Sequence, residues 1–390
     1  MLKNVFLIIL IVAFAYPLKL YLEGDNAEND FRRGMDHYNN QELAESVPWF
    51  EQAAEQGHAI AQYHLGLMYL DGTGVLKDLA QSEQWFHEAA MQEYPDAQAH
   101  LGKMYLNVKD FQEAEKWYRK AAEKGLAQAQ TQLGEMYQEG KGVNQDITEA
   151  LKWYKKAAIK GEPQAQNHLG LMYSQGDGIT QDVTQATEWF RKAAKQGLAQ
   201  AQFNLAEMYY NDADIEKDIT KAVAWYTKAA HKGYAKAQLK LGLLRKNGEG
   251  IAQDVVVAKQ WHQKAANQGL AQAQFQLGML YYDGIGVPHS FFDAGTWFKK
   301  AAEQGYDKAQ NNLGLLYYDG KGVGQDFAIA AQWYQKAAEQ GNVDAQVNLG
   351  VMYEKGKGVP KDVMKAVHWL SKAAEQGDPI AQDAIKRILR

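Results

Sequence analysis

Apolar residues along this chain recur at the spacing of an amphipathic α-helix. In the segment around Gln166 a first stripe, at positions i, i+4, i+7 and i+8, consists of Ala165, Leu169, Met172 and Tyr173. A second stripe, at i, i+3, i+4, i+7 and i+8, consists of Ala186, Trp189, Phe190, Ala193 and Ala194. The pattern predicts two helices joined by a short connection, each of which buries one face.

The residues between and beyond these stripes suit the ends of two helices. Gly176 and Gly178 are placed to end the first helix and form a turn, and Asp182 is placed to cap the second helix. Gly197 is expected to close the second helix in a left-handed conformation. Gly170 lies inside the first helix, where glycine costs about 1 kcal/mol relative to alanine. We therefore expect a close approach at Gly170 that a side chain would block.

The same helical pair returns along nearly the whole chain. An Ala-Gln pair has its glutamine at positions 62, 98, 130, 166, 202, 238, 274, 310, 346 and 382. The tryptophans fall at 49, 85, 117, 153, 189, 225, 261, 297, 333 and 369, one in each repeat. A period of this length is typical of a solenoid, in which each unit is stabilised by stacking on its neighbours. We expect ten hairpins, the first an atypical unit at 27–57, and a lone capping helix within 379–390.

The repeat pattern AQxxLGxMYxxGxGVxxDxxxAxxWYxKAAxxG resembles the Sel-one-like repeat (SLR), a branch of the tetratricopeptide-repeat superfamily. The resemblance covers roughly residues 27–390. It implies an all-α fold, a right-handed α/α superhelical solenoid used for protein–protein interaction. It also implies an adaptor or scaffold role rather than catalysis.

The N-terminal residues 1–22 differ from the repeats. Lys3 precedes an apolar core at Val5–Phe14, and an Ala-Phe-Ala sequence at 13–15 resembles a signal-peptidase site. The apolar run is shorter than the ~18–20 residues that span a bilayer, and Pro17 and Lys19 interrupt its continuation. We predict a cleaved signal peptide or, alternatively, an uncleaved anchor. Both predict export, to the periplasm, to the periplasmic face of the inner membrane, or out of the cell.

Charge and composition narrow the possible partners. The net charge is −5 with both signs interspersed, so the chain lacks the basic stripe typical of nucleic-acid binders. Cysteine is absent, which excludes disulfides, thiol nucleophiles and zinc–thiolate sites. We therefore expect no nucleic-acid partner, and membrane contact through the N-terminal segment alone if it is retained.

Three recurring features resemble chemical sites but fit the repeat better. The GKGV and GDGI turns lack the strand and the Gly-Lys-Ser/Thr sequence of a phosphate-binding loop. His64, His100 and His168 share one position in successive first helices, where stacked repeats lie ~9–10 Å apart, too far to share one zinc ion. Glu135 and Glu207 are two repeats apart, too distant to act on one bond. We predict no catalytic residue, no metal site and no cofactor.

A binding groove is the remaining candidate. By analogy with tetratricopeptide folds, the first helix of each hairpin should line the concave face. Its exposed positions lie one, two, five and eight residues after the glutamine, here called +1, +2, +5 and +8. The later repeats place aromatic and amide side chains there, a composition typical of interface hot spots. The predicted partner-binding residues are Phe203, Asn204, Tyr210, Phe275, Gln276, Tyr282, Asn312 and Tyr318. The competing interpretation is that these rings pack against neighbouring repeats.

Together with the predicted export, the family resemblance implies a non-catalytic scaffold of the bacterial cell envelope that binds another protein or peptide in this groove. The family resemblance leaves two alternatives open, a periplasmic immunity protein that neutralises a secreted lipase-type effector and a factor that engages host proteins. A purely structural envelope protein without a partner is a further possibility.

Overall fold

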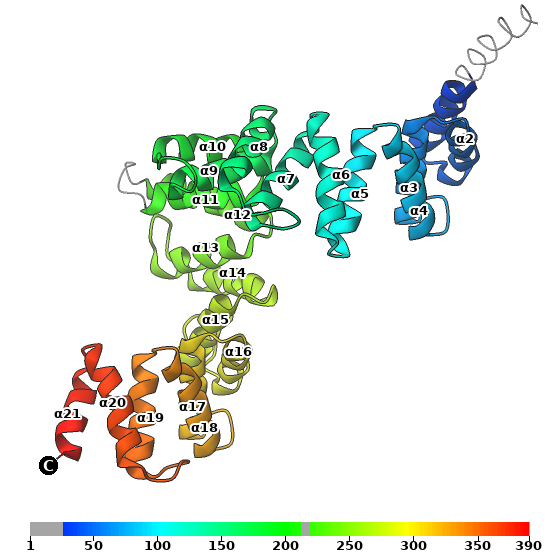
Figure 1. Ribbon diagram of the computed structural model, residues 1–390. Coiled ribbons are helices and arrows are strands. Elements are labelled where there is room, and N and C mark those ends of the chain that lie inside the picture. The colour runs from blue at the N-terminus through cyan, green and yellow to red at the C-terminus, as the bar shows by residue number, and fades with distance from the viewer. Residues whose placement is uncertain (1–25, 212–217, 390) are drawn as a thin grey trace, which may run out of the picture. The chain divides into compact units, whose positions relative to one another are not determined.

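The computed structural model describes residues 26–211 and 218–389, and all regular secondary structure in these ranges is helical (Figure 1). The predicted signal peptide or anchor at 1–22 lies outside the described residues. None of the described helices is long and apolar enough to cross a membrane. The all-α repeat architecture expected from the sequence is confirmed.

The chain divides into two compact units, residues 1–193 and 194–390. The helices that begin in the first unit are residues 26–39, α2 (Leu43–Glu55), α3 (Ala59–Asp71), α4 (Leu79–Met91), α5 (Pro95–Asn107), α6 (Phe111–Glu123), α7 (Ala127–Glu139), α8 (Ile147–Ile159), α9 (Pro163–Gln175) and α10 (Val183–Lys195). Those of the second unit are α11 (Ala199–Asn211), α12 (Ile219–His231), α13 (Ala235–Asn247), α14 (Val255–Asn267), α15 (Ala271–Asp283), α16 (Phe291–Glu303), α17 (Asp307–Asp319), α18 (Phe327–Glu339), α19 (Val343–Lys355), α20 (Val363–Glu375) and α21 (Pro379–Ile388).

Within each unit the helices pack in chain order. Each odd-numbered helix from α3 onward is the first helix of a hairpin, and the even-numbered helix after it is the second. In the second unit every second helix also packs against the first helix of the next hairpin. The described residues hold the ten expected hairpins, followed by α21 alone.

The helix ends follow the sequence expectation. The Asp182 carboxylate accepts a hydrogen bond of 2.9 Å from the Gln185 N–H, and Ser290 caps α16 in the same way. Gly176 and Gly197 have φ angles of +74° and +92°, a left-handed conformation that glycine adopts without a steric penalty. These capping residues fix where each helix begins and ends, and so position the faces described below.

A buried side chain, usually a ring, packs on the backbone of each first helix. It belongs to the residue that follows the tryptophan, and its exposed fraction is 3% or less in every repeat. A Cβ atom added to Gly170 would lie 2.5 Å from the Phe190 ring. The predicted close approach is confirmed, and the group that approaches is this ring. The most deeply buried large side chain of the repeat is therefore the neighbour of the tryptophan.

The tryptophans pack against the preceding hairpin. Trp153 joins a cluster with Ala121 and Ala122, and Trp261 joins one with Ala229 and Ala230. The small alanine pair accommodates the large indole. From Trp117 onward the lysine three residues later lies over the indole ring, with Lys156 Nζ 3.9 Å from the Trp153 centroid. This cation–π contact explains the lysine of the repeat pattern.

The glutamine of each Ala-Gln pair forms a hydrogen bond between hairpins. From Gln62 to Gln346 this side chain is 2–5% exposed, and its amide donates to the carbonyl of the second alanine in the preceding hairpin over 2.9–3.2 Å. In five repeats its Oε1 also accepts from a glutamine 30 residues later. These donor–acceptor pairs are Gln92–Gln62, Gln268–Gln238, Gln304–Gln274, Gln340–Gln310 and Gln376–Gln346.

The last helix ends the stack differently. Gln382 is exposed although it is the glutamine of an Ala-Gln pair, and Lys386 occupies the position at which earlier first helices have the glycine. A ring cannot pack on α21 as it does on the other first helices. Arg387 instead reaches back to Glu354 with two hydrogen bonds of 3.0 and 2.8 Å. The structure of α21 thus agrees with the predicted capping role.

Candidate functional site

The eight predicted partner-binding residues all lie on first helices of the second unit. Phe203, Asn204 and Tyr210 are on α11, and the others are on α15 (Phe275, Gln276, Tyr282) and α17 (Asn312, Tyr318). Each of the eight side chains is partly buried. The first-helix face, meaning the surface formed by the +1, +2, +5 and +8 positions, therefore combines contacts within the stack with accessible atoms.

The two phenylalanines pack mainly inside the stack. The Phe203 ring lies 5.7 Å from the ring of Tyr226 and 5.3 Å from that of Tyr234. Phe275 repeats this arrangement two hairpins further on, with the same distances to Phe298 and Tyr306. Phe203 and Phe275 thus contribute to packing between hairpins, in line with the competing interpretation of these rings.

Two of the tyrosines at position +8, Tyr282 and Tyr318, contact the start of the second helix of their own hairpin, whereas Tyr210 contacts the turn of the next hairpin. The Tyr282 ring lies 5.2 Å from that of Phe291, and the Tyr318 ring lies 5.1 Å from that of Phe327. The Tyr210 hydroxyl donates a hydrogen bond of 2.8 Å to Glu249. Burial, together with this carboxylate, raises the pKa of Tyr210 to about 12, so the phenol remains protonated at physiological pH.

The amides at position +2 reach across to the preceding hairpin. The Asn312 amide lies 3.2 Å from the sulfur of Met279, which is the +5 residue of that hairpin. Two pairs of ionisable side chains use the same geometry. His168 Nε2 lies 3.0 Å from Glu135, and Lys240 Nζ lies 3.4 Å from Glu207. Glu135 and Glu207 are thus each paired with a side chain of the following hairpin.

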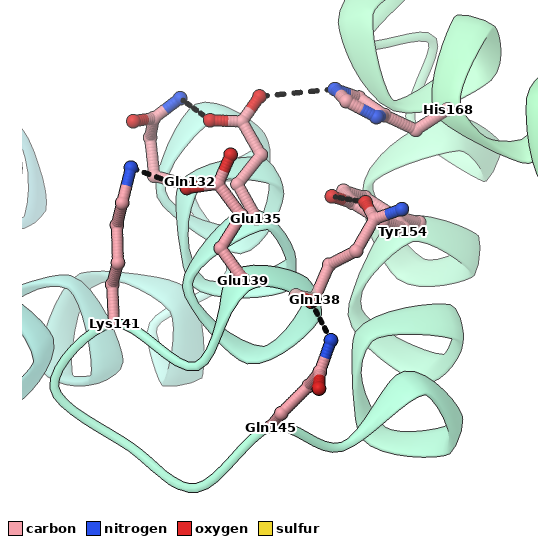
Figure 2. A network of polar contacts seen from close by, with 8 residues as sticks. All are labelled: Gln132, Glu135, Gln138, Glu139, Lys141, Gln145, Tyr154 and His168. Atoms are coloured by element: carbon pink, nitrogen blue, oxygen red, sulfur yellow. Dashed lines mark hydrogen bonds and ion pairs between the residues drawn. The ribbon is translucent and has the colours of Figure 1, made fainter. Parts of the chain in front are cut away.

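Figure 2 shows the first of these pairs, His168 with Glu135. Glu135 reaches from α7 toward His168 on α9, and Gln132 donates a hydrogen bond of 2.9 Å to the other carboxylate oxygen. The Tyr154 hydroxyl donates to Gln138 over 2.8 Å. Every carboxylate oxygen of Glu135 therefore has a partner inside the protein, which leaves the group suited to holding two hairpins together.

The three histidines in equivalent positions each stack on a buried ring. His64 lies on Phe50, His100 on Phe86 and His168 on Tyr154, with ring centroids 5.4, 4.9 and 4.6 Å apart. Burial lowers the pKa values of His64 and His100, which favours the neutral imidazole. Among the described residues no group of three or more His, Asp or Glu side chains is placed to hold a metal ion.

A cleft of 280 Å³ opens on the first-helix face of the second unit. Its walls come from three consecutive first helices or their starts, and consist of Phe203, Glu207, Lys236, Leu239, Lys240, Leu243, Leu270 and Gln272. Phe203 is the single predicted partner-binding residue among them. The sequence reasoning missed Lys236, Leu270 and Gln272 because they lie outside the four positions that it considered. The high number of lysines in α13 is the feature of the sequence that could have pointed to these residues.

The first unit has a comparable cleft of 260 Å³ between α5 and α7. Its lining includes His100 and Gln132 at position +2, together with Lys103 and Leu106. The first-helix face is therefore hollowed in both units, and the residue types that line the hollow differ from one unit to the other.

Comparison with known protein families identifies the same repeats. The profile described as Sel1 repeat matches ten segments, residues 44–58, 59–94, 95–126, 127–162, 163–198, 199–234, 235–270, 271–306, 307–342 and 343–378. The chain belongs to the Sel1 repeat family. The resemblance seen in the sequence is confirmed, and the segment boundaries from residue 59 onward coincide with the starts of the first helices.

Two solved Sel1 repeat structures are similar over most of the chain. A protective antigen present in uropathogenic Escherichia coli strains, which displays an SLR fold, is 38% identical over 94% of this chain and 80% of its own, with a TM-score of 0.74. A Sel1 repeat protein from Oxalobacter formigenes is 37% identical over 78% of this chain and 90% of its own, with a TM-score of 0.60. No curated protein matches the chain significantly.

An immunity protein from Pseudomonas aeruginosa is a remote neighbour. It is 22% identical over 57% of this chain and 83% of its own, with a TM-score of 0.35. A likeness at this level has no bearing on the function of the Sel1 repeat chain described here.

Proposed function

We propose that this Sel1 repeat protein is a non-catalytic scaffold of the bacterial cell envelope that holds a partner protein or peptide on the first-helix face of its second unit. A Sel1 repeat solenoid fits a role in protein–protein interaction. The observation that carries the proposal is the cleft bounded by α11, α13 and the start of α15, in which apolar walls meet several polar groups. Apolar walls with a few placed polar groups are typical of ligand-binding sites in proteins.

The cellular location is part of the proposal. The positive start, apolar core and Ala-Phe-Ala sequence of residues 1–22 favour export. Fractionation of cells, followed by mass spectrometry of the mature N-terminus, tests this. A periplasmic protein that begins after residue 15 supports a cleaved signal peptide, and an intact N-terminus in the inner-membrane fraction supports an anchor. Recovery of the intact chain in the cytoplasm would contradict export.

A host-facing role is the second candidate. The Escherichia coli relative, 38% identical, is described as a protective antigen. If this chain acts in the same setting, its partner is a host protein. Binding to host-cell extract but not to envelope extract distinguishes this candidate from the envelope scaffold.

The proposal is tested with the affinity-tagged full chain and envelope extract from the cells that produce it. The partner-binding variant carries Gln272→Arg and Gln276→Arg, which add bulk and charge to the first-helix face of α15. Removing Phe275 and Tyr282 would be less specific, because both rings also pack within the stack.

The matched control carries Gln332→Arg and Gln335→Arg on α18, which is the second helix of its hairpin. Both of these glutamine side chains are exposed. We expect mass spectrometry to recover a partner in stoichiometric amounts with the wild-type chain and the control, and to lose it with the α15 variant. Equal recovery by both variants would reject the first-helix face as the binding surface.

A further inference from the structure

The second unit contains one first helix whose charge differs from all the others. Helix α13 carries Lys236, Lys240, Arg245 and Lys246 and no acidic residue. The other first helices from α3 to α21 each carry at most two lysines or arginines, and most of them carry an acidic residue. This local excess stands out in a chain with a net charge of −5.

Side chains of α13 supply half of the cleft described above. Lys236, Leu239, Lys240 and Leu243 all line it, and their spacing places them on one face of the helix. Phe203 and Leu270 complete an apolar wall, and Gln272 adds an exposed amide. Ammonium groups and aliphatic side chains therefore alternate along one side of the cleft.

The carboxylate in the cleft is already engaged. Glu207 accepts hydrogen bonds from the Tyr226 hydroxyl and from Asn211, the latter over 2.6 Å, and it pairs with Lys240 at 3.4 Å. Lys240 also lies 4.3 Å from the centroid of the Tyr210 ring. These contacts hold the Lys240 ammonium group in place, and the Glu207 carboxylate neutralises its charge.

The other two lysines have no such counter-charge. Lys236 is exposed, and no carboxylate among the described residues forms an ion pair with it. Lys246, at position +8 of the same helix, is partly buried, and it too forms no ion pair with a carboxylate in the part of the chain that the structure describes. Helix α13 thus carries two ammonium groups without an ion-pair partner among the described residues, Lys236 in the cleft and Lys246 ten residues further along the helix, with leucines between them.

We infer that the cleft binds an acidic segment of a partner protein in which carboxylates alternate with apolar side chains. This inference rests on the proposed function and names the chemistry of the partner. Carboxylates of the segment complement Lys236 and Lys246, and its apolar side chains fill the space beside Leu239, Leu243 and Leu270. Charge complementarity of this kind sets specificity and association rate more than total affinity.

The apolar wall favours a peptide over other anions. A nucleic acid backbone or a lipid headgroup satisfies ammonium groups, but neither places aliphatic carbon between them at the spacing of adjacent helical turns. Burying the exposed parts of Leu243 and Leu270 against a partner side chain also removes water from the nearby charges, which strengthens their attraction to carboxylates.

Fluorescence anisotropy with the full chain tests the inference. The probe is a short fluorescein-labelled peptide that alternates glutamate pairs with leucine pairs, and the reference peptide has glutamine in place of every glutamate. At an ionic strength of about 0.1 M, where the Debye length is about 10 Å, we expect the acidic peptide to bind roughly tenfold more tightly than the reference. Equal affinities would overturn the inference.

Variants locate the binding on α13. Lys236→Glu with Lys246→Glu reverses both uncompensated charges, and we expect it to weaken binding of the acidic peptide roughly tenfold or more. The matched control is Lys308→Glu, because Lys308 is exposed at the position of α17 that Lys236 occupies in α13. Circular dichroism verifies that the variants fold, and Lys236→Gln with Lys246→Gln provides a milder replacement. An equal loss with Lys308→Glu would assign the effect to overall charge and overturn the site.

Competition identifies the class of anion. Single-stranded DNA or vesicles containing phosphatidylserine that displace the acidic peptide and bind more tightly than it does would overturn the peptide assignment. Failure of this inference is distinguishable from failure of the proposed function. If the α15 variant loses its captured partner while the α13 variant does not, the binding face stands and its preference for acidic segments is wrong.

Discussion

His262 is the residue at which the chain departs most clearly from its own repeat. It follows Trp261 and occupies the ring position on Gly242, where other repeats have Phe, Tyr or Leu. The side chain is fully buried, and neither ring nitrogen has a hydrogen-bond partner among the described residues. Replacement by phenylalanine keeps the ring and removes two unpartnered polar atoms. We expect His262→Phe to raise the free energy of unfolding by about 1–3 kcal/mol in urea denaturation at neutral pH.

The same residue predicts a pH dependence. Burial, with a contribution from the charge of Lys246, lowers the pKa of His262 to about 4, whereas an unfolded histidine has a value of about 6.5. The unfolded chain therefore binds the proton more readily, and His262 makes the protein lose stability as the pH falls from about 6.5 toward about 4. His262→Phe should show a smaller loss over this interval. Phe298→His, the mirror change in the next repeat, should show a larger one, and parallel curves for all three chains would contradict the argument.

At the scale of the element, the stack depends on an amide network that is incomplete. In three repeats a lysine stands where the others have the donor glutamine, at positions 124, 160 and 232. The corresponding acceptors, Oε1 of Gln98, Gln130 and Gln202, are buried without a partner among the described residues. Lys232→Gln restores the donor for Gln202, and we expect it to stabilise the protein by about 0.5–1.5 kcal/mol, measured by urea denaturation.

The opposite substitution serves as its control. In the repeat that follows the one with Lys232, Gln268 donates a hydrogen bond of 2.8 Å to Gln238. Gln268→Lys removes this donor at an equivalent position, so the two variants should shift stability in opposite directions. A gain from both, or a loss from both, would mean that the network has no net effect and that helix propensity or surface charge dominates.

Element boundaries were predictable from the sequence because they depend on local chemistry. Asp182 caps a helix through its own carboxylate, and Gly176 ends one through its own backbone freedom. The role of the Ala-Gln glutamine was not predictable in this way. Its partners lie in the preceding hairpin and 30 residues further along the chain, and an amide that recurs in each repeat is equally compatible with an exposed position.

The candidate site was predictable in its location but not in its composition. The spacing after each glutamine identified the first-helix face, on which the structure places a cleft. Which rings pack inside the stack was not predictable from the sequence, because it depends on residues of other helices. Phe275, for example, contacts a residue of α16 and a residue that precedes α17. Lys236 was missed because it lies two residues before the glutamine, at the edge of the face.

At the scale of the whole molecule, the contacts within each unit are local, since hairpins pack on their neighbours in the chain. The free energy of unfolding should then be a sum of hairpin and interface contributions. A destabilising change at one end of the stack should therefore leave the hairpins at the other end unaffected. Helix α21 covers Leu370 and Ala373, which are both fully buried. Deleting residues 379–390 exposes them, at a cost of roughly 1.5–3 kcal/mol for Leu370 alone.

Hydrogen exchange distinguishes this local damage from a general effect. Amide protection in α19 and α20 should fall after the deletion, while protection in α3–α6 should be unchanged. Ile380→Gln is the control, because Ile380 lies on the same helix but is 66% exposed, and its substitution should alter stability by less than about 0.5 kcal/mol. A uniform loss of protection along the chain would show that the protein unfolds as one cooperative body. The additive description of the stack would then be wrong.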